Sequence, residues 1–244
     1  MDKKVVLVTG SAKGIGKATI TEFAKKGYDV VINYKNSVNE ANTLKDELER
    51  NYHIKAIAVK ADVSNEYDVK SMIKIIMNEF SHIDVLVNNA GIAIDKEFEE
   101  RTVEDWNKTL STNLIGPFLV SKYVGEVMMN QKAGKIINIS STNGINSFFP
   151  TSIDYDASKA GVINLTHNLA IQFAPYINVN CVAPGWVNTE MNQELPKDLI
   201  KEETAKIYKK RFAEPSEIGK VVCFLASEDA DFINDEVIKV DGGY

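Results

Sequence analysis

Residues 5–16 read VVLVTGSAKGIG: a short apolar run, a turn with three glycines, and the start of a helical pattern that continues to about Lys26. Glycines let such a turn close tightly and let its backbone approach a pyrophosphate, while the helix start offers free N–H groups and a partial positive charge. The spacing is Gly10-x-x-x-Gly14-x-Gly16, not the tighter G-x-G-x-x-G. We expect a dinucleotide site here, with simple turn chemistry as the alternative. It would also include Ser11, Lys13 and Ile15.

Along the rest of the chain, short β-branched runs alternate with helical patterns. The predicted strands are residues 5–9, 30–33, 54–59, 85–87, 136–140, 179–182 and 237–240. Strands that are apolar throughout indicate a sheet covered on both faces, which is what parallel β-α-β crossovers build. The sequence therefore predicts an α/β fold: a Rossmann-like, doubly wound sheet of seven parallel strands with helices on both faces. Such sheets bind ligands beyond the carboxyl ends of the strands.

The size and composition of the chain favour one globular domain over residues 1–244. It has 244 residues, of which 44% are hydrophobic and 25% charged, and no repeat or linker interrupts it. Only residues 188–207 break the alternation: they are polar and contain Pro196. We expect this segment to be a mobile lid over the site, or else a plain surface loop.

Several classes of protein are disfavoured by the composition. A net charge of −6 and the lack of basic runs argue against binding of nucleic acid, and no apolar stretch approaches the ~18 residues of a membrane span. Met1 to Lys4 lead straight into the first strand, so we expect no signal peptide and a cytoplasmic protein. The two cysteines, Cys181 and Cys223, and the three histidines are scattered, so we expect buried thiols and no metal site.

The end of the second strand predicts which dinucleotide is bound. An acidic residue about 20 positions past the glycines normally holds the ribose 2′-hydroxyl, but the strand ends in Asn33-Tyr34-Lys35-Asn36. No carboxylate stands there to repel a 2′-phosphate, and Lys13 and Lys35 could pair with one. The sequence therefore favours NADP(H) over NAD(H), unless both lysines are ordinary surface charges. Asp62, after the third strand, could reach the adenine ring or cap the following helix.

Tyr155 and Lys159 are four residues apart, an interval that puts both side chains on one face of a helix. A tyrosine titrates near pH ~10, so stabilising its phenolate at neutral pH takes roughly 3–4 kcal/mol. A lysine charge ~6 Å away supplies about 3 kcal/mol at an effective dielectric of ~20. The pair therefore predicts an acid/base device, although such spacing also arises by chance on surface helices.

Taken together, these residues resemble the short-chain dehydrogenase/reductase family over essentially the whole chain. The resemblance rests on residues 9–16, the Asn88-Asn89-Ala90-Gly91 run, the Pro184-Gly185 pair, and on Asn113, Ser141, Tyr155 and Lys159. Each lies in the expected order, at the carboxyl end of a predicted strand or on the helix after it. A catalytically idle redox sensor is a remote alternative, because such proteins lose the tyrosine or the lysine.

The resemblance implies a role for each catalytic residue. Tyr155 would exchange a proton with the substrate oxygen while hydride moves to or from the nicotinamide, and Lys159 would stabilise the phenolate and hold the nicotinamide ribose. Ser141 would hydrogen-bond the substrate oxygen; its neighbour Ser140 is the rival, and the Ser-x-x-Gly pattern favours Ser141. Asn113 would hold a water in a proton relay, or else be a buried amide that satisfies backbone groups.

The resemblance also implies further cofactor contacts. Ala90 and Gly91 would let the ribose lie against backbone, Asn89 would be partly structural, and the Val187 backbone and Thr189 hydroxyl would hold the carboxamide. The remaining predicted contacts are Asn33, Tyr34, Asp62, Val63, Tyr155, Pro184 and Gly185. Trp186 would wall the site or be a core residue.

The aspartates on either side of Tyr155 could oppose Lys159 by raising the tyrosine pKa. We expect Lys159 to remain dominant, because neighbours at one residue point elsewhere on a helix. The preferred interpretation is that Ser152 caps this helix and that Asp154 and Asp156 complement its dipole in the first turn.

Among branches of the family, the chain looks most similar to bacterial 3-oxoacyl-[acyl-carrier-protein] reductases, which implies a role in fatty acid biosynthesis. Such an enzyme meets an acidic acyl carrier protein with basic residues at its mouth, for which Lys132 and Lys135 are candidates; Tyr176 stands where arginine is common. Reduction of a sugar, polyol or general ketone is the alternative. Phe148, Phe149 and Pro150 would form one apolar wall, and a homotetramer or dimer is expected by analogy.

Overall fold

Seven apolar runs form one sheet in the computed structural model of the chain, which describes residues 3–193 and 195–244. The strands are β1 (Val5–Val8), β2 (Asp29–Tyr34), β3 (Ala56–Lys60), β4 (Val85–Asn88), β5 (Gly134–Ile139), β6 (Ile177–Pro184) and β7 (Val237–Val240). Across the described residues their order is β3-β2-β1-β4-β5-β6-β7, and all neighbours are parallel. The predicted doubly wound α/β sheet is confirmed, with strand ends shifted by at most two residues.

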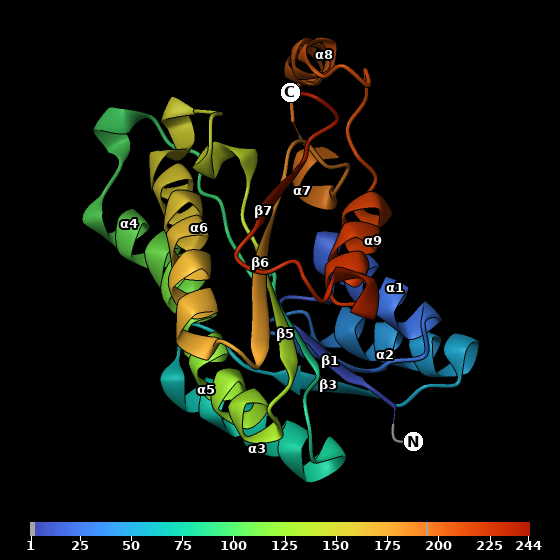
Figure 1. Cartoon of the computed structure of the whole chain (residues 1–244). Helices are drawn as coiled ribbons and strands as arrows, with labels where there is room; N and C mark the ends of the chain where they lie inside the picture. The colour runs from blue at the N-terminus through green and yellow to red at the C-terminus, as the bar shows by residue number, and fades with distance from the viewer. Residues whose placement is uncertain (1–2, 194) are drawn as a thin grey trace.

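Helices cover both faces of this sheet (Figure 1). One layer holds α1 (Gly14–Lys25), α2 (Val38–Tyr52) and α9 (Pro215–Leu225); the other holds α3 (Glu66–Phe80), α5 (Gly116–Gln131) and α6 (Ile153–Phe173). Alternate residues of a strand enter different layers: Val6 and Val8 pack with the first, Val5 and Leu7 with the second. Both sets are apolar because both faces are covered, which explains the uninterrupted apolar runs.

The strand order places a switch point between β1 and β4, because the chain runs outward to β2 and β3 and then returns to the other side of β1. The loops after β1 and β4 are therefore neighbours. Gly10 has a φ of +62°, and a Cβ there would lie 2.9 Å from the Ala90 Cα. Only glycine fits this contact, so the turn and the β4 loop pack directly against each other.

The segment predicted as a lid, residues 188–207, follows β6 and contains two short helices. These are α7 (Glu190–Gln193) and α8 (Lys197–Lys206); Glu194, within the predicted lid, lies outside the described residues. Between β4 and α5 the chain forms α4 (Val103–Leu110) and a π-helical segment, Ser111–Ile115. Short 3₁₀ turns lie at Phe98–Glu100, Thr142–Gly144, Pro150–Ser152 and Glu228–Ala230.

Candidate active site

A cavity of about 870 Å³ opens at the carboxyl ends of the strands, where the switch point predicts a ligand site. It brings together most of the residues singled out in the sequence. They are Gly10, Lys13, Gly14, Ile15, Asn33, Tyr34, Lys35, Asp62, Val63, Asn89, Ala90, Gly91, Ser141, Tyr155, Lys159, Pro184, Gly185, Val187 and Thr189. Three predicted residues lie behind its wall instead: Ser11, Gly16 and Asn113.

Ser11 and Gly16 hold the glycine turn together. The Ser11 hydroxyl donates to the Val8 carbonyl at 2.8 Å, and its backbone N–H donates to the Asn33 carbonyl at 3.0 Å. A Cβ on Gly16 would lie 2.5 Å from the Asn89 Nδ2, so the start of α1 packs against the β4 loop. These two residues do not line the cavity, and their predicted contact with a cofactor stays a prediction.

The start of α1 presents backbone N–H groups to the cavity. Lys13 stands at the N-cap, its side chain makes no cap hydrogen bond, and no acidic residue lies in the first turn of this described helix. Gly14, with a φ of +54°, faces Thr189 across the cavity: a Cβ there would lie 3.6 Å from the Thr189 Cγ2. A helix N-terminus left open in this way attracts anions.

The asparagines beside the turn serve the backbone. Asn33 accepts a hydrogen bond from the Gly10 N–H at 3.1 Å and donates to the Ala61 carbonyl at 3.1 Å. The Asn89 amide donates to the Thr9 and Gly10 carbonyls at 2.9 and 3.2 Å. Both residues line the cavity, but their amides fix the three loops around it.

Each lysine at the β2 end of the cavity is paired with a carboxylate. The Lys13 ammonium lies 2.7 Å from Glu40, and the Lys35 ammonium lies 2.6 Å from Asp62. Burial raises the pKa of Asp62, but Lys35 and two hydrogen bonds from Ser64 hold it below its ordinary value overall. The alternative in which Asp62 caps the next helix is wrong, because α3 is capped by the Asn65 side chain.

Tyr155 and Lys159 lie one turn apart on α6, as their spacing predicts. The Lys159 ammonium is 5.4 Å from the centroid of the Tyr155 ring and donates to the Ile139 carbonyl at 2.9 Å. Lys159 is only 5% exposed, and burial lowers its pKa to about 8. The cation therefore lies over the ring, anchored to the end of β5.

Burial also controls the tyrosine. It raises the pKa of Tyr155 to about 12; a side-chain hydrogen bond with Ser141 opposes this shift, and the Asp156 charge adds to it. The expectation that Lys159 dominates the tyrosine pKa is thus wrong. The physical reason is that removing a phenolate from water costs more free energy than the Ser141 hydrogen bond recovers.

The two adjacent serines point to different partners. The Ser140 hydroxyl donates to the Lys159 carbonyl at 2.7 Å and so fastens α6 to the end of β5. The Ser141 hydroxyl accepts from the Asn143 N–H at 3.2 Å and hydrogen-bonds Tyr155. Of the two hydroxyls, Ser141 is thus the one beside the tyrosine.

Asn113 lies in the π-helical segment, and its side chain is 1% exposed. Its amide accepts from the Ile92 N–H and donates to the Ile92 carbonyl, both at 2.8 Å, and also donates to the Ser158 hydroxyl at 3.1 Å. The side chain therefore ties the loop after β4 to α6, next to Lys159. π-Helical turns are frequent at functional sites.

Ser152 stands at the N-cap position of α6 and both aspartates lie in its first turn, as expected, but the predicted side-chain cap is wrong. The Ser152 hydroxyl makes no cap hydrogen bond. Asp154 is fully buried and pairs with Arg101 at 2.7 Å and with the Thr109 hydroxyl at 2.7 Å. Asp156 accepts from the Asn143 side chain at 2.6 Å and the Phe149 N–H at 3.0 Å. Both aspartates therefore hold loops around Tyr155.

An aromatic cluster forms part of the cavity wall. Trp186 lines the cavity, stacks on Phe212 with a centroid distance of 5.4 Å, and meets Phe149 edge-on at 5.5 Å. The prediction of a wall made by residues 148–150 holds only for Phe149, since Phe148 and Pro150 do not line the cavity.

The basic residues proposed for the mouth lie elsewhere on this chain. Lys132 ends α5, and Lys135 stands at the amino end of β5, paired with Asp231 at 2.6 Å. This is the opposite end of the sheet from the cavity. Sequence reasoning also missed lining residues such as Asn143, Asn192, Leu199 and Tyr244, because no local motif marks them.

Among residues 3–193 and 195–244, no group of three His, Cys, Asp or Glu side chains is placed to hold a metal ion. No helix in the same part of the chain is both long and apolar enough to cross a membrane.

Known proteins resemble this chain along nearly its whole length. Residues 10–244 match the family model described as Enoyl-(Acyl carrier protein) reductase. A 3-oxoacyl-[acyl-carrier-protein] reductase of Synechocystis is 40% identical over 242 residues, covering 98% of this chain and 96% of that protein. The FabG 3-oxoacyl-[acyl-carrier-protein] reductase of Staphylococcus epidermidis is 38% identical, covering 98% of both chains.

A solved structure has the same fold over nearly the whole chain. The crystal structure of a putative gluconate dehydrogenase from Agrobacterium tumefaciens superimposes with a TM-score of 0.93 and 31% identity, covering 99% of this chain and 95% of that one. With a match to the family model over residues 10–244 and relatives at 36–40% identity, the chain belongs to the short-chain dehydrogenase/reductase family of dinucleotide-dependent oxidoreductases.

Proposed function

We propose that the protein is an NADPH-dependent reductase that converts the keto group of a 3-oxoacyl thioester, carried on an acyl carrier protein, into a hydroxyl group. The observation that carries the proposal is the meeting of Tyr155, Ser141 and Lys159 beside the open start of α1 in one cavity. The choice of substrate is supported by the names of the relatives that share 36–40% of its residues.

The residues present fit a dinucleotide. Gly10 and Gly14 adopt left-handed backbone conformations, and the N–H groups at the start of α1 are free to bind a pyrophosphate. Gly91 lines the cavity, and a Cβ there would lie 3.6 Å from the Lys159 ammonium, so a ribose against its backbone would lie beside that lysine. When bound, NADPH supplies the hydride.

Tyr155 would give the proton that the reduced oxygen needs. With a pKa of about 12, its hydroxyl stays protonated at neutral pH and can donate. Ser141, which hydrogen-bonds this hydroxyl, would present a second donor to the same substrate oxygen. Lys159 would stabilise the tyrosinate left behind and hold the nicotinamide ribose.

Asn113 and the loop after β6 would complete the site. Because the Asn113 amide is bonded to both backbone groups of Ile92, we assign it the task of keeping that loop in place beside Lys159. The water relay that the resemblance implies stays a prediction. Val187 and Thr189 would hold the carboxamide, and α7 and α8 would form the lid.

The preference for NADP(H) rests on charge at the β2 end of the cavity. Lys13 and Lys35 line it, and the strand ends without the carboxylate that would repel a 2′-phosphate. Glu40 and Asp62 currently neutralise both lysines, so a 2′-phosphate would have to displace at least one of these carboxylates.

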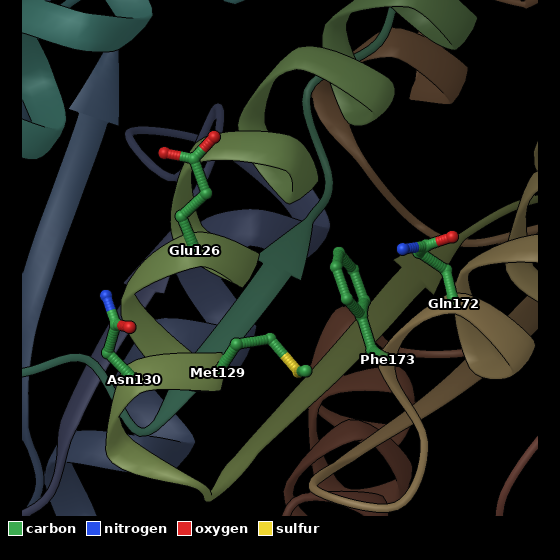
Figure 2. A pocket seen from close by; sticks show the side chains of 5 residues that line it. All are labelled: Glu126, Met129, Asn130, Gln172 and Phe173. Atoms are coloured by element: carbon green, nitrogen blue, oxygen red, sulfur yellow. The ribbon is translucent and has the colours of Figure 1, made fainter.

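Assembly as a homotetramer is proposed through α5 and α6. Both carry exposed apolar side chains, Phe118 and Ile171, and a pocket of about 410 Å³ lies between them. Figure 2 shows Met129 and Phe173 facing each other in this pocket. Copies of the chain packed on this face would cover that surface.

The test is NADPH oxidation, followed by absorbance, with acetoacetyl thioesters on a carrier protein and on a small thiol. The proposal expects turnover of both, with the higher kcat/KM for the carrier-bound form and a loss of this advantage at high salt. Turnover of gluconate-type sugar acids or polyols with no turnover of thioesters would contradict it. That result would favour the second candidate, which the match to the putative gluconate dehydrogenase supports.

A further inference from the structure

A buried carboxylate lies behind the substrate side of the cavity. Glu203 is 2% exposed, and among the described residues of α8 it is the one that is buried. Its Oε2 accepts hydrogen bonds from the Trp186 indole N–H at 2.9 Å and from the Tyr244 hydroxyl. Its Oε1 accepts from the Lys206 ammonium at 2.7 Å. We call this group of four residues the Glu203 cluster.

The partners of Glu203 come from segments far apart in the sequence. Trp186 follows β6, and Tyr244 stands 41 residues beyond Glu203, where Figure 1 shows the end of the chain beside α8. Backbone bonds hold that end in place: Tyr208 N–H donates to the Gly243 carbonyl at 2.9 Å, and Lys209 N–H to Gly242 at 3.2 Å. The carboxylate therefore joins three segments.

Two of these partners are walls of the cavity. Trp186 and Tyr244 both line it, and Trp186 is held on its other sides by Phe212 and Phe149. The indole can rotate only if it breaks its hydrogen bond to Glu203. Fixing α8 therefore also fixes the shape of the cavity where Trp186 and Tyr244 line it.

A purely structural contact would not need a charge at this position. Removing a carboxylate from water is costly unless donors surround it, and a leucine would bury more favourably. Here each of the three contacts to the carboxylate comes from a donor group. The arrangement orients its partners, which an apolar side chain cannot do.

We propose that Glu203 is a positioning residue for the substrate: its carboxylate holds Trp186 and Tyr244 as fixed walls and docks α8 against them, thereby setting which carbon chain fits beside Tyr155. This inference rests on the proposed function, because it takes the cavity to bind a carbonyl substrate. The tyrosine hydroxyl and the indole N–H serve specificity, not proton transfer.

The test compares Glu203→Gln with Glu202→Gln. Both glutamates contact Lys206, but Glu202 is exposed and touches neither wall residue in the described structure. Glutamine at position 203 has no charge and only one acceptor oxygen for the three donors, so at least one contact of the cluster must be lost and the others weakened. We expect KM for the acetoacetyl thioester to rise at least about fivefold with kcat within about twofold in Glu203→Gln, and no change in Glu202→Gln. Tyr244→Phe should give the same split to a smaller degree.

A second readout does not depend on turnover. The chain has two tryptophans, so Trp106→Phe leaves Trp186 as the single reporter. In that background Glu203→Gln should shift the emission to longer wavelength and increase quenching by acrylamide, while Glu202→Gln should leave both unchanged.

The outcomes separate the two claims. No turnover of any thioester, sugar or ketone by the wild type would overturn the proposed function and this inference together. Turnover by the wild type with Glu203→Gln indistinguishable from Glu202→Gln in KM would overturn this inference alone. An altered Trp186 emission with an unchanged KM would also overturn it, because the wall would then move without consequence for the substrate.

Discussion

The Lys159 ammonium lies over the Tyr155 ring, 5.4 Å from its centroid. Its hydrogen bond goes to the Ile139 carbonyl at the end of β5. Burial, not mutual attraction, therefore sets the pKa of each group, lowering that of Lys159 to about 8 and raising that of Tyr155 to about 12. This arrangement keeps the tyrosine protonated and the lysine mostly charged at neutral pH, which suits the direction of reduction.

The pH dependence of reduction should follow Lys159. With a pKa of about 8 the ammonium loses its proton as the pH rises through that value, while Tyr155 keeps its own to much higher pH. We expect kcat/KM for NADPH, which reports groups of the free enzyme, to be constant near pH 6–7 and to fall above about 8. A profile that stays flat to pH ~10 would contradict this assignment.

Removing the lysine charge should stabilise the fold while abolishing activity. The pKa of Lys159 is about 8 in the folded state, against an ordinary value of 10.5. The unfolded chain therefore binds the proton more tightly, which lowers the free energy of unfolding by roughly 3 kcal/mol at neutral pH. Losing the hydrogen bond to Ile139 offsets about 1 kcal/mol of this. We expect Lys159→Met to raise the free energy of unfolding at pH 7 by about 1–2 kcal/mol in urea denaturation.

The sign of the linkage provides the control for Lys159→Met. Between pH 8 and 10.5 the unfolded wild type holds a proton that the folded state has lost, so its stability gains from rising pH. The advantage of Lys159→Met should therefore shrink over this range. A variant that is less stable than the wild type at pH 7 would contradict the burial argument.

Cofactor choice should depend on Lys13. Its ammonium lines the cavity and is paired with Glu40, which lies outside the lining. We expect Lys13→Ala to weaken NADPH binding about five- to tenfold and leave NADH binding unchanged, since only NADPH carries a 2′-phosphate. Dissociation constants from tryptophan quenching give the measurement, and Lys17→Ala, on the same helix but outside the cavity, is the matched control. An equal loss for both cofactors would refute the phosphate contact.

The buried pair of Arg101 and Asp154 should be essential for stability. Both side chains are at most 2% exposed, their nearest atoms are 2.7 Å apart, and Arg101 also donates to the Ile94 carbonyl at 2.9 Å. Arg101→Met leaves the buried Asp154 carboxylate without a cation and with only the Thr109 hydroxyl as a side-chain donor, which should cost about 3–5 kcal/mol in chemical denaturation. Arg101→Met with Asp154→Leu should recover part of this loss. If Arg101→Met alone were as stable as the wild type, the Asp154 carboxylate would have to be solvated, and the pair would not be essential for stability.

Much of the fold could be predicted because the sheet is covered on both faces. Val5 to Val8 are apolar at every position since alternate residues enter different layers, and this pattern distinguishes buried parallel strands from edge strands. The pattern could not fix strand ends, since Pro184 still belongs to β6 although the predicted strand stops at residue 182.

The parts of the site that lie close in sequence were also predictable. The glycine turn, Tyr155 and Lys159 lie on local elements whose geometry follows from spacing. Partners that are distant in sequence were not: Asp154 reads as a first-turn residue of a helix, but the fold brings Arg101, 53 positions earlier, onto it. Glu203 and Tyr244 meet for the same reason.

The position of Lys135, away from the cavity, could have been predicted from the sequence. Lys135 precedes the apolar core of its strand, so a parallel sheet must place it at the amino end, away from a cavity at the carboxyl ends. The position of a residue within its strand therefore carries as much information about a binding surface as its charge does.

Proton donation by Tyr155 during carbonyl reduction is best tested by single-turnover oxidation of NADPH by Tyr155→Phe with an acetoacetyl thioester. We expect a rate lower by a factor of about 10²–10⁴ than that of the wild type, with unchanged NADPH affinity and unchanged thermal stability. A rate within a few-fold of the wild type would contradict it.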